Sequence, residues 1–154
     1  MKLFVRTALL LGWAAGCAGR EAGGPAVCPV EGVLVVDGAP AANARVAFHP
    51  AGGGPAARPV GVTGPDGGFR LSTHAPGDGA PAGDYVVTVL WPDDSMPVDE
   101  CECPDPAAHD RLRGAYLNPA TSPLRATVGP GPNRVALRAE VGSRGWNLPR
   151  RPGA

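Results

Sequence analysis

Turn residues that alternate with short apolar runs constrain this chain more than any other feature of its sequence. Residues 61–72 (GVTGPDGGFRLS) carry a Pro-Asp-Gly turn followed by a run that places Phe69 and Leu71 on one face of a strand. Residues 81–91 (PAGDYVVTVLW) begin with Pro-Ala-Gly and continue as a longer run rich in β-branched and aromatic residues. This pattern predicts a small β-sandwich, and no equally distinct catalytic motif accompanies it in the sequence.

The rest of the chain repeats this pattern often enough to fill one domain. Apolar and polar residues alternate in about seven segments, at 30–36, 45–49, 60–63, 69–72, 84–91, 124–128 and 134–138. The segment 84–91 has apolar residues on both faces, which predicts a central strand. The 23 glycines and 19 prolines are therefore interpreted as the turns and loops of an all-β domain rather than as the composition of a disordered chain.

The N-terminus predicts export and a lipid anchor. Two cations, Lys2 and Arg6, precede an apolar stretch at residues 7–15 that is too short to span a bilayer, so residues 1–16 fit a signal peptide. The stretch ends in Ala-Ala-Gly-Cys, which resembles the bacterial lipobox and predicts lipidation of Cys17; ordinary signal cleavage, with Cys17 as a bystander, is the alternative. Residues 17–28 are then expected to form a flexible tether that holds the domain at the membrane of the cell envelope.

The order of the motifs resembles bacterial transthyretin-like lipoproteins with a carboxypeptidase regulatory-like domain. The resemblance covers roughly residues 30–138, and the motifs that carry it are Val30-x-Gly32-x-Leu34, Asp37-Gly38-Ala-Pro40, Val46-Ala-Phe48-His-Pro50, Thr63-Gly-Pro-Asp66-Gly-Gly-Phe69-Arg-Leu71, Gly77-Asp-Gly-Ala-Pro81-Ala-Gly83-Asp-Tyr85, Tyr116-Leu-Asn-Pro119-x-x-Ser122-Pro-Leu124 and Asn133-x-Val135-x-Leu137. It implies a seven-stranded Greek-key, prealbumin-like sandwich at residues 29–141, exported and membrane-tethered, usually without enzymatic activity. Cys101 and Cys103 depart from the family pattern.

The residues that could carry catalysis do not form a recognisable set. The three histidines, His49, His74 and His109, are scattered, with no nucleophile elbow and no metalloprotease helix motif near them. The sequence Ser-Arg-Gly-Trp at 143–146 does not match the terminal motif of transthyretin-like hydrolases. Because Lys2 is the only lysine, the mature protein cannot form a Lys–Asn isopeptide bond. We therefore expect a protein that is not an enzyme and needs no cofactor.

Three cysteines remain after lipidation of Cys17, in a compartment where disulfides persist. Cys28 precedes the first strand, and Cys101 and Cys103 lie in a long loop. One bridge from Cys28 to either loop cysteine is predicted to fix this loop to the domain. The alternative hypothesis is a periplasmic metal- or thiol-binding protein, in which Cys101 and Cys103, with His109, hold a soft metal.

The charge pattern directs attention to the loop at residues 92–123. The formal net charge of zero argues against nucleic acid as a partner. Residues 93–110 hold seven acidic residues and no basic one, which favours a solvated acidic face over a calcium site. The C-terminal stretch is basic, and its tail at residues 142–154 is expected to be disordered. We expect this loop to bind an envelope protein or a glycan, through Asp99, Glu100, Arg111 and an exposed Tyr116.

Overall fold

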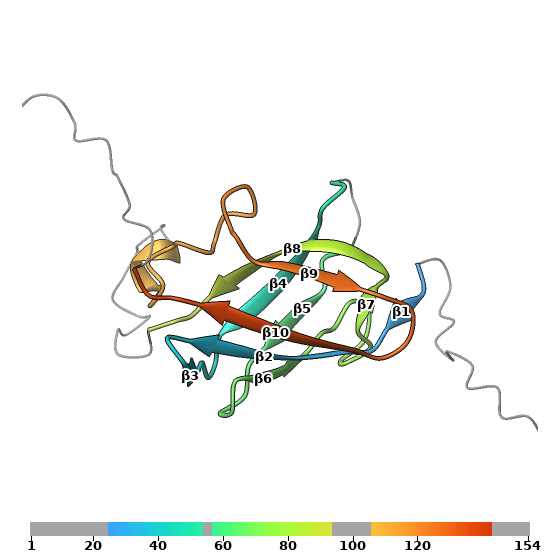
Figure 1. Ribbon diagram of the computed structural model, residues 1–154, viewed down its shortest axis with the longest axis horizontal. Coiled ribbons are helices and arrows are strands. Elements are labelled where there is room, and N and C mark those ends of the chain that lie inside the picture. The colour runs from blue at the N-terminus through green and yellow to red at the C-terminus, as the bar shows by residue number, and fades with distance from the viewer. Residues whose placement is uncertain (1–24, 54–56, 94–105, 143–154) are drawn as a thin grey trace, which may run out of the picture.

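The computed structural model describes residues 25–53, 57–93 and 106–142. Within these ranges the protein is all-β: two four-stranded sheets enclose one hydrophobic core, and a two-stranded ladder lies at one end (Figure 1). A short 3-10 helix, Pro106–His109, lies at the opposite end. No helix among the described residues has the length and apolar character needed to cross a membrane.

The first sheet is built around β2 (Val30–Val36). The last strand, β10 (Asn133–Ala139), pairs in parallel with all seven residues of β2. On the other side of β2, β6 (Gly68–Arg70) and β3 (Ala39–Pro40) both pair antiparallel, β6 near the start of β2 and β3 at its end. The chain segments that begin and end the domain are therefore neighbours in one sheet.

The second sheet is antiparallel throughout, in the order β5-β4-β8-β9. Its strands are β5 (Val60–Val62), β4 (Arg45–Pro50), β8 (Gly83–Leu90) and β9 (Arg125–Val128). The longest strand, β8, lies between β4 and β9, which confirms the prediction of a central strand at this position.

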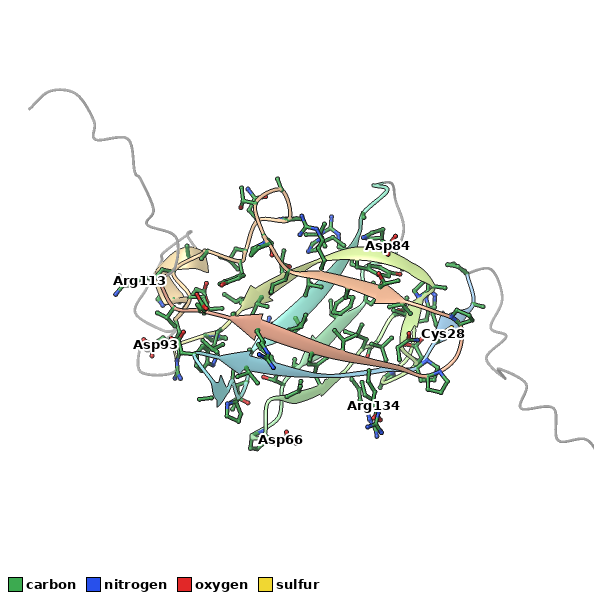
Figure 2. All side chains as sticks on the ribbon, viewed as in Figure 1. Cys28, Asp66, Asp84, Asp93, Arg113 and Arg134 are labelled. Carbon is green, nitrogen blue, oxygen red and sulfur yellow. The ribbon has the colours of Figure 1, made fainter. Side chains whose placement is uncertain are left out.

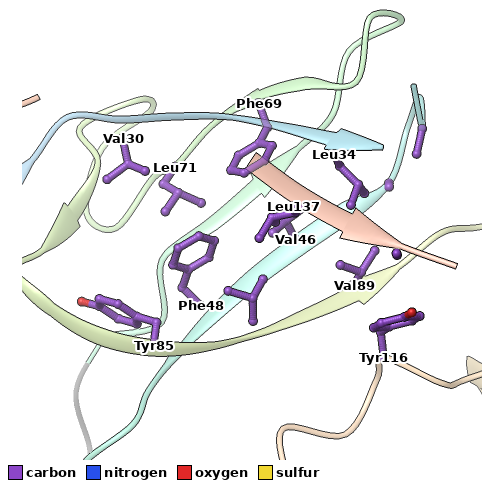
Figure 3. Packing of buried hydrophobic residues seen from close by; sticks show 14 of the residues in the cluster. Val30, Leu34, Val46, Phe48, Phe69, Leu71, Tyr85, Val89, Tyr116 and Leu137 are labelled. Atoms are coloured by element: carbon purple, nitrogen blue, oxygen red, sulfur yellow. The ribbon is translucent and has the colours of Figure 1, made fainter. Parts of the chain in front are cut away.

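The core follows the alternation expected from the sequence. In β2, Leu34 and Val36 are buried, and in β4 Val46 and Phe48 are buried, while their neighbours are partly or fully exposed. Figure 3 shows Leu34, Val46 and Phe48 directed into the space between the two sheets, together with side chains from β8 and β10 such as Val89 and Leu137. At roughly 1.5–3 kcal/mol for each large buried side chain, this burial is the main stabilising contribution to a domain of this size.

All seven predicted strands are present, with boundaries shifted by at most a few residues. Three strands of two residues each were not predicted: β3, β1 (Val27–Cys28) and β7 (Ala80–Pro81). Because β1 pairs antiparallel with β7 and Cys28 is buried, the predicted tether over residues 17–28 is too long; its last two residues belong to the folded domain. The signal peptide and the basic tail at residues 142–154 lie outside the described residues, apart from Gly142.

The close approach of Phe69 to β2 within the first sheet requires a glycine at position 32. Gly32 in β2 lies opposite Phe69 in β6, and the Phe69 ring occupies the space that a side chain at Gly32 would need. A Cβ atom at this position would lie less than 3.0 Å from three ring carbons. The glycine thus allows the ring, which is 5% exposed, to pack flat against the backbone of the neighbouring strand.

Candidate binding surface

Tyr116, predicted as an exposed aromatic on the binding loop, belongs to the core instead. It is 6% exposed, and Figure 3 shows its ring beside Val89. Its hydroxyl accepts a hydrogen bond from the backbone N–H of Glu140 at 3.0 Å, and its carbonyl accepts one from Val89 at 3.1 Å. The prediction of an exposed Tyr116 is therefore wrong; its hydroxyl and its carbonyl attach this part of the loop to both sheets.

The same part of the loop is held by a buried carboxylate. Asp110 is 5% exposed and accepts hydrogen bonds from the backbone N–H groups of Trp91 at 2.9 Å, Leu112 at 3.2 Å and Gly114 at 2.8 Å. A buried carboxylate needs several donors, and these three satisfy both of its oxygens. Asp110 therefore acts as a structural anchor for residues 110–116 and is not available to a ligand.

Arg111 is the one predicted loop contact that lies within the described residues and on the surface. Its guanidinium stacks 5.0 Å from the centre of the Trp91 ring, and its Nε lies 4.0 Å from a carboxylate oxygen of Asp93. Each of these two exposed contacts contributes little to stability on its own. Asp99 and Glu100 lie outside the described residues, so their part in the predicted binding loop stays a prediction.

Of the four cysteines, only Cys28 lies within the described residues. Cys28 carries a free thiol that is 8% exposed, at the end of the molecule opposite Asp93, where the described part of the long loop begins (Figure 2). Cys17, Cys101 and Cys103 lie outside the described residues, so lipidation and the bridge to Cys28 stay predictions. His109 ends the 3-10 helix, and no group of three metal-ligating side chains occurs in the described ranges.

The two remaining histidines occupy different surroundings. The His49 ring bonds the Thr88 hydroxyl at 2.8 Å across β4 and β8, and burial, followed by the charge of Arg58, lowers the pKa of His49. His74 lies exposed in the turn that Asp78 organises through its carboxylate, which accepts hydrogen bonds from three successive backbone N–H groups. These interactions stabilise local structure.

A surface that the sequence analysis did not single out lies on the outer face of the first sheet. Three shallow hollows, of about 490, 370 and 450 Å³, lie along this face, and the first extends past β6 to Val62 of β5 in the second sheet. The first two share Glu31 and Gly32, and the third lies at the other end of β2 and β10, beside Val35 and Arg138. The three hollows therefore follow β2 and β10 along the sheet.

The chemistry of this face is mixed: arginines and acidic residues surround an apolar centre. Val33, 37% exposed, lies opposite Ala136, and Arg134 and Arg138 project from β10 on either side of Ala136. Figure 2 shows Arg134 pointing away from the body of the sandwich. Arg70 on β6 forms an ion pair with Glu31 at 2.8 Å. The signal was present in the sequence as two arginines four positions apart in an alternating strand.

No family model, no curated protein and no solved structure matches the chain.

Proposed function

We propose that this protein is a non-catalytic binding module of the bacterial cell envelope, attached to membrane lipid through Cys17. It binds an envelope protein or a glycan on the outer face of β10, β2 and β6. The finer fold, a seven-stranded Greek-key sandwich of the transthyretin-like, carboxypeptidase regulatory-like kind, is part of the same proposal and rests on the order and spacing of the sequence motifs.

The observation that carries the proposal is the row of three hollows along β2 and β10, of which the first extends past β6 to Val62 of β5. Extended surfaces with an apolar centre and a charged border suit macromolecular partners better than they suit a small substrate, which needs an enclosed pocket. The face also combines exposed valine and alanine with three arginines, and arginine is enriched in protein interfaces.

The binding part of the proposal is tested by site-specific photo-crosslinking in cells. A benzoylphenylalanine is placed at Val33, in the centre of the proposed face, and, as a matched control, at Thr127, an exposed position on the outer face of the other sheet. Crosslinked products at position 33 and none at position 127 support the proposal. No product at either position, or equal products at both, contradicts it.

The membrane part is tested by growth with a labelled fatty acid. The chain is expected to incorporate the label and to sediment with membranes, and Cys17→Ala is expected to lose both properties. A chain that sediments with membranes without incorporating label would contradict anchoring through Cys17.

A further inference from the structure

The last strand of the sandwich has one side that no described strand covers. In β10 the odd-numbered residues point their backbone groups toward β2: the N–H of Asn133 donates to Pro29 at 2.9 Å, and the carbonyl of Ala139 accepts from Asp37 at 3.1 Å. Because N–H and C=O alternate sides along a strand, the backbone groups of Arg134, Ala136 and Arg138 point to the other side. Among the described strands, β10 pairs with β2 alone.

The uncovered edge has a defined length. At its far end, the N–H of Glu140 points to the same side and donates to the Tyr116 hydroxyl at 3.0 Å. At its near end, Asn133 closes the turn after β9 through hydrogen bonds of its side chain to Gly129 and Gly131. Six residues, 134–139, remain between these two ends and span roughly 20 Å, which is the length of an ordinary strand.

The core is incompletely covered along the same side of the molecule. The edge strands β9 and β10 both lie at the open side of their sheets (Figure 1), and no backbone pairing joins them. Leu124 before β9, Ala126 in β9 and Val135 in β10 are only partly buried, although all three pack against the core. A strand added to β10 would present alternate side chains toward these residues, which favours apolar or β-branched residues at those positions.

The arginines on the outward face of β10 favour an added strand that carries carboxylates. Within the described residues, neither Arg134 nor Arg138 has a carboxylate within 4.0 Å, whereas Glu31 is already paired with Arg70. The two arginines lie four positions apart, so a carboxylate on each of two outward residues of an added strand, also four apart, would face them. A second copy of β10 fits poorly, because an antiparallel pair centred on Ala136 would place Arg134 opposite Arg138 of the other copy.

From these observations we propose that the open edge of β10 binds an extended acidic peptide segment of a partner protein by antiparallel strand addition. The proposal rests on the proposed function and names the partner class for it. Backbone groups of Arg134, Ala136 and Arg138 hold the peptide, and the two guanidiniums bind carboxylates at alternate outward positions. Main-chain pairing supplies affinity in this mode, and the side chains supply selectivity.

The test uses a synthetic peptide, acetyl-Thr-Glu-Val-Ser-Val-Glu-Thr-amide, and the full-length chain in detergent micelles. Titration followed by hydrogen exchange is expected to slow exchange of the Arg134, Ala136 and Arg138 amides about tenfold or more, with little change at Val135 and Leu137, which already pair with β2. A peptide with lysine in place of glutamate, and one with an N-methyl group at the central serine, are expected not to bind.

Two variants separate the roles of charge and backbone. The double variant Arg134→Glu, Arg138→Glu is expected to bind the glutamate peptide more weakly and to gain binding of the lysine peptide. Misfolding could not produce such a gain. Ala136→Pro removes an N–H that the β2 pairing does not use, so it is expected to abolish peptide binding while circular dichroism stays unchanged. Arg134→Ala with Arg138→Ala is expected to weaken binding roughly 3- to 30-fold, as for two exposed ion pairs.

Three results would overturn the proposal. If neither peptide protects the edge amides, the arginines only discourage edge pairing, as charged residues on edge strands commonly do. Equal binding of the glutamate and lysine peptides to the unmodified chain would show that the two arginines do not select an acidic partner. Protection of the same amides by self-association, without peptide, would assign the edge to a second copy. Because crosslinking at Val33 is measured separately, a failure here with crosslinks retained would reject the edge and leave the proposed binding face standing.

Discussion

Replacing Gly32 with alanine should destabilise the domain, although alanine normally stabilises a strand relative to glycine. The new Cβ would lie less than 3.0 Å from three carbons of the Phe69 ring, which is itself part of the core. The ring must move, and the close packing around it resists that movement.

The expected magnitude follows from two opposing effects. Forcing an extra carbon into a packed site costs about 1–3 kcal/mol. The smaller backbone entropy of alanine in the unfolded chain offsets about 0.5–1 kcal/mol of this cost. With the middle of each range, the net loss in free energy of unfolding is about 1 kcal/mol, which corresponds to a fall in Tm of roughly 5 °C for a domain of this size.

The measurement is denaturant and thermal unfolding of Gly32→Ala beside a matched glycine variant. Gly52→Ala is the control, because no atom lies within 4 Å of its new Cβ and its backbone does not adopt a positive φ. It is expected to change stability by less than about 0.5 kcal/mol. A double-mutant cycle with Phe69→Leu then tests the cause: the cost of Gly32→Ala should shrink when the ring is absent. A Gly32→Ala cost near zero, or the same cost with and without the ring, would refute the reasoning.

The remaining predictions concern a thiol, a histidine and the buried anchor of the loop. Because Cys28 is free and buried in the structure, an alkylating reagent should react with it slowly in the folded protein and fully after unfolding without reductant; protection that persists until reduction would establish the bridge to the loop instead. The pKa of His49 is lower in the folded protein than its ordinary value of 6.5, so the unfolded chain binds more protons, and the free energy of unfolding should fall as the pH drops from about 7 through the folded pKa. The variant His49→Gln should flatten this slope in unfolding measured at several pH values. An unchanged slope would contradict the assignment. Asp110→Asn would point amide hydrogens at backbone donors and should cost about 1–3 kcal/mol, with faster hydrogen exchange at Leu112 and Gly114, whereas Asp84→Asn, on an exposed site, should change stability little.

Strands whose side chains alternate in burial were predictable from the sequence, and the short ones were not. In β2 and β4 the pattern of valine, leucine and phenylalanine identified both the strand and its buried face, because a period of two separates the two faces of a sheet. Strands β1, β3 and β7 have two residues each, too few to show a period, and contain or adjoin proline. Their pairing depends on where distant segments lie.

The binding surface was harder to predict than the fold, for a physical reason. Tyr116 lies in a turn-rich segment without periodicity, so nothing local indicates that its ring packs on β8 and its hydroxyl reaches the end of β10. Conversely, Arg134 and Arg138 resembled ordinary solvent-facing residues of a strand. Their possible role depends on β10 being at the edge of its sheet, and strand order is a property of the whole chain.

The parallel pairing of β2 with β10 also affects when the domain can fold. The two strands come from opposite ends of the described chain, and a hydrogen bond from Val141 to Asp37 beside them joins residues 104 positions apart. Contacts of such long range form late, because the intervening chain must first be brought together. During synthesis, one flank of β2 therefore stays unpaired until β10 has emerged from the ribosome. The order of translation thus keeps the first sheet unfinished until residues 133–139 have been made.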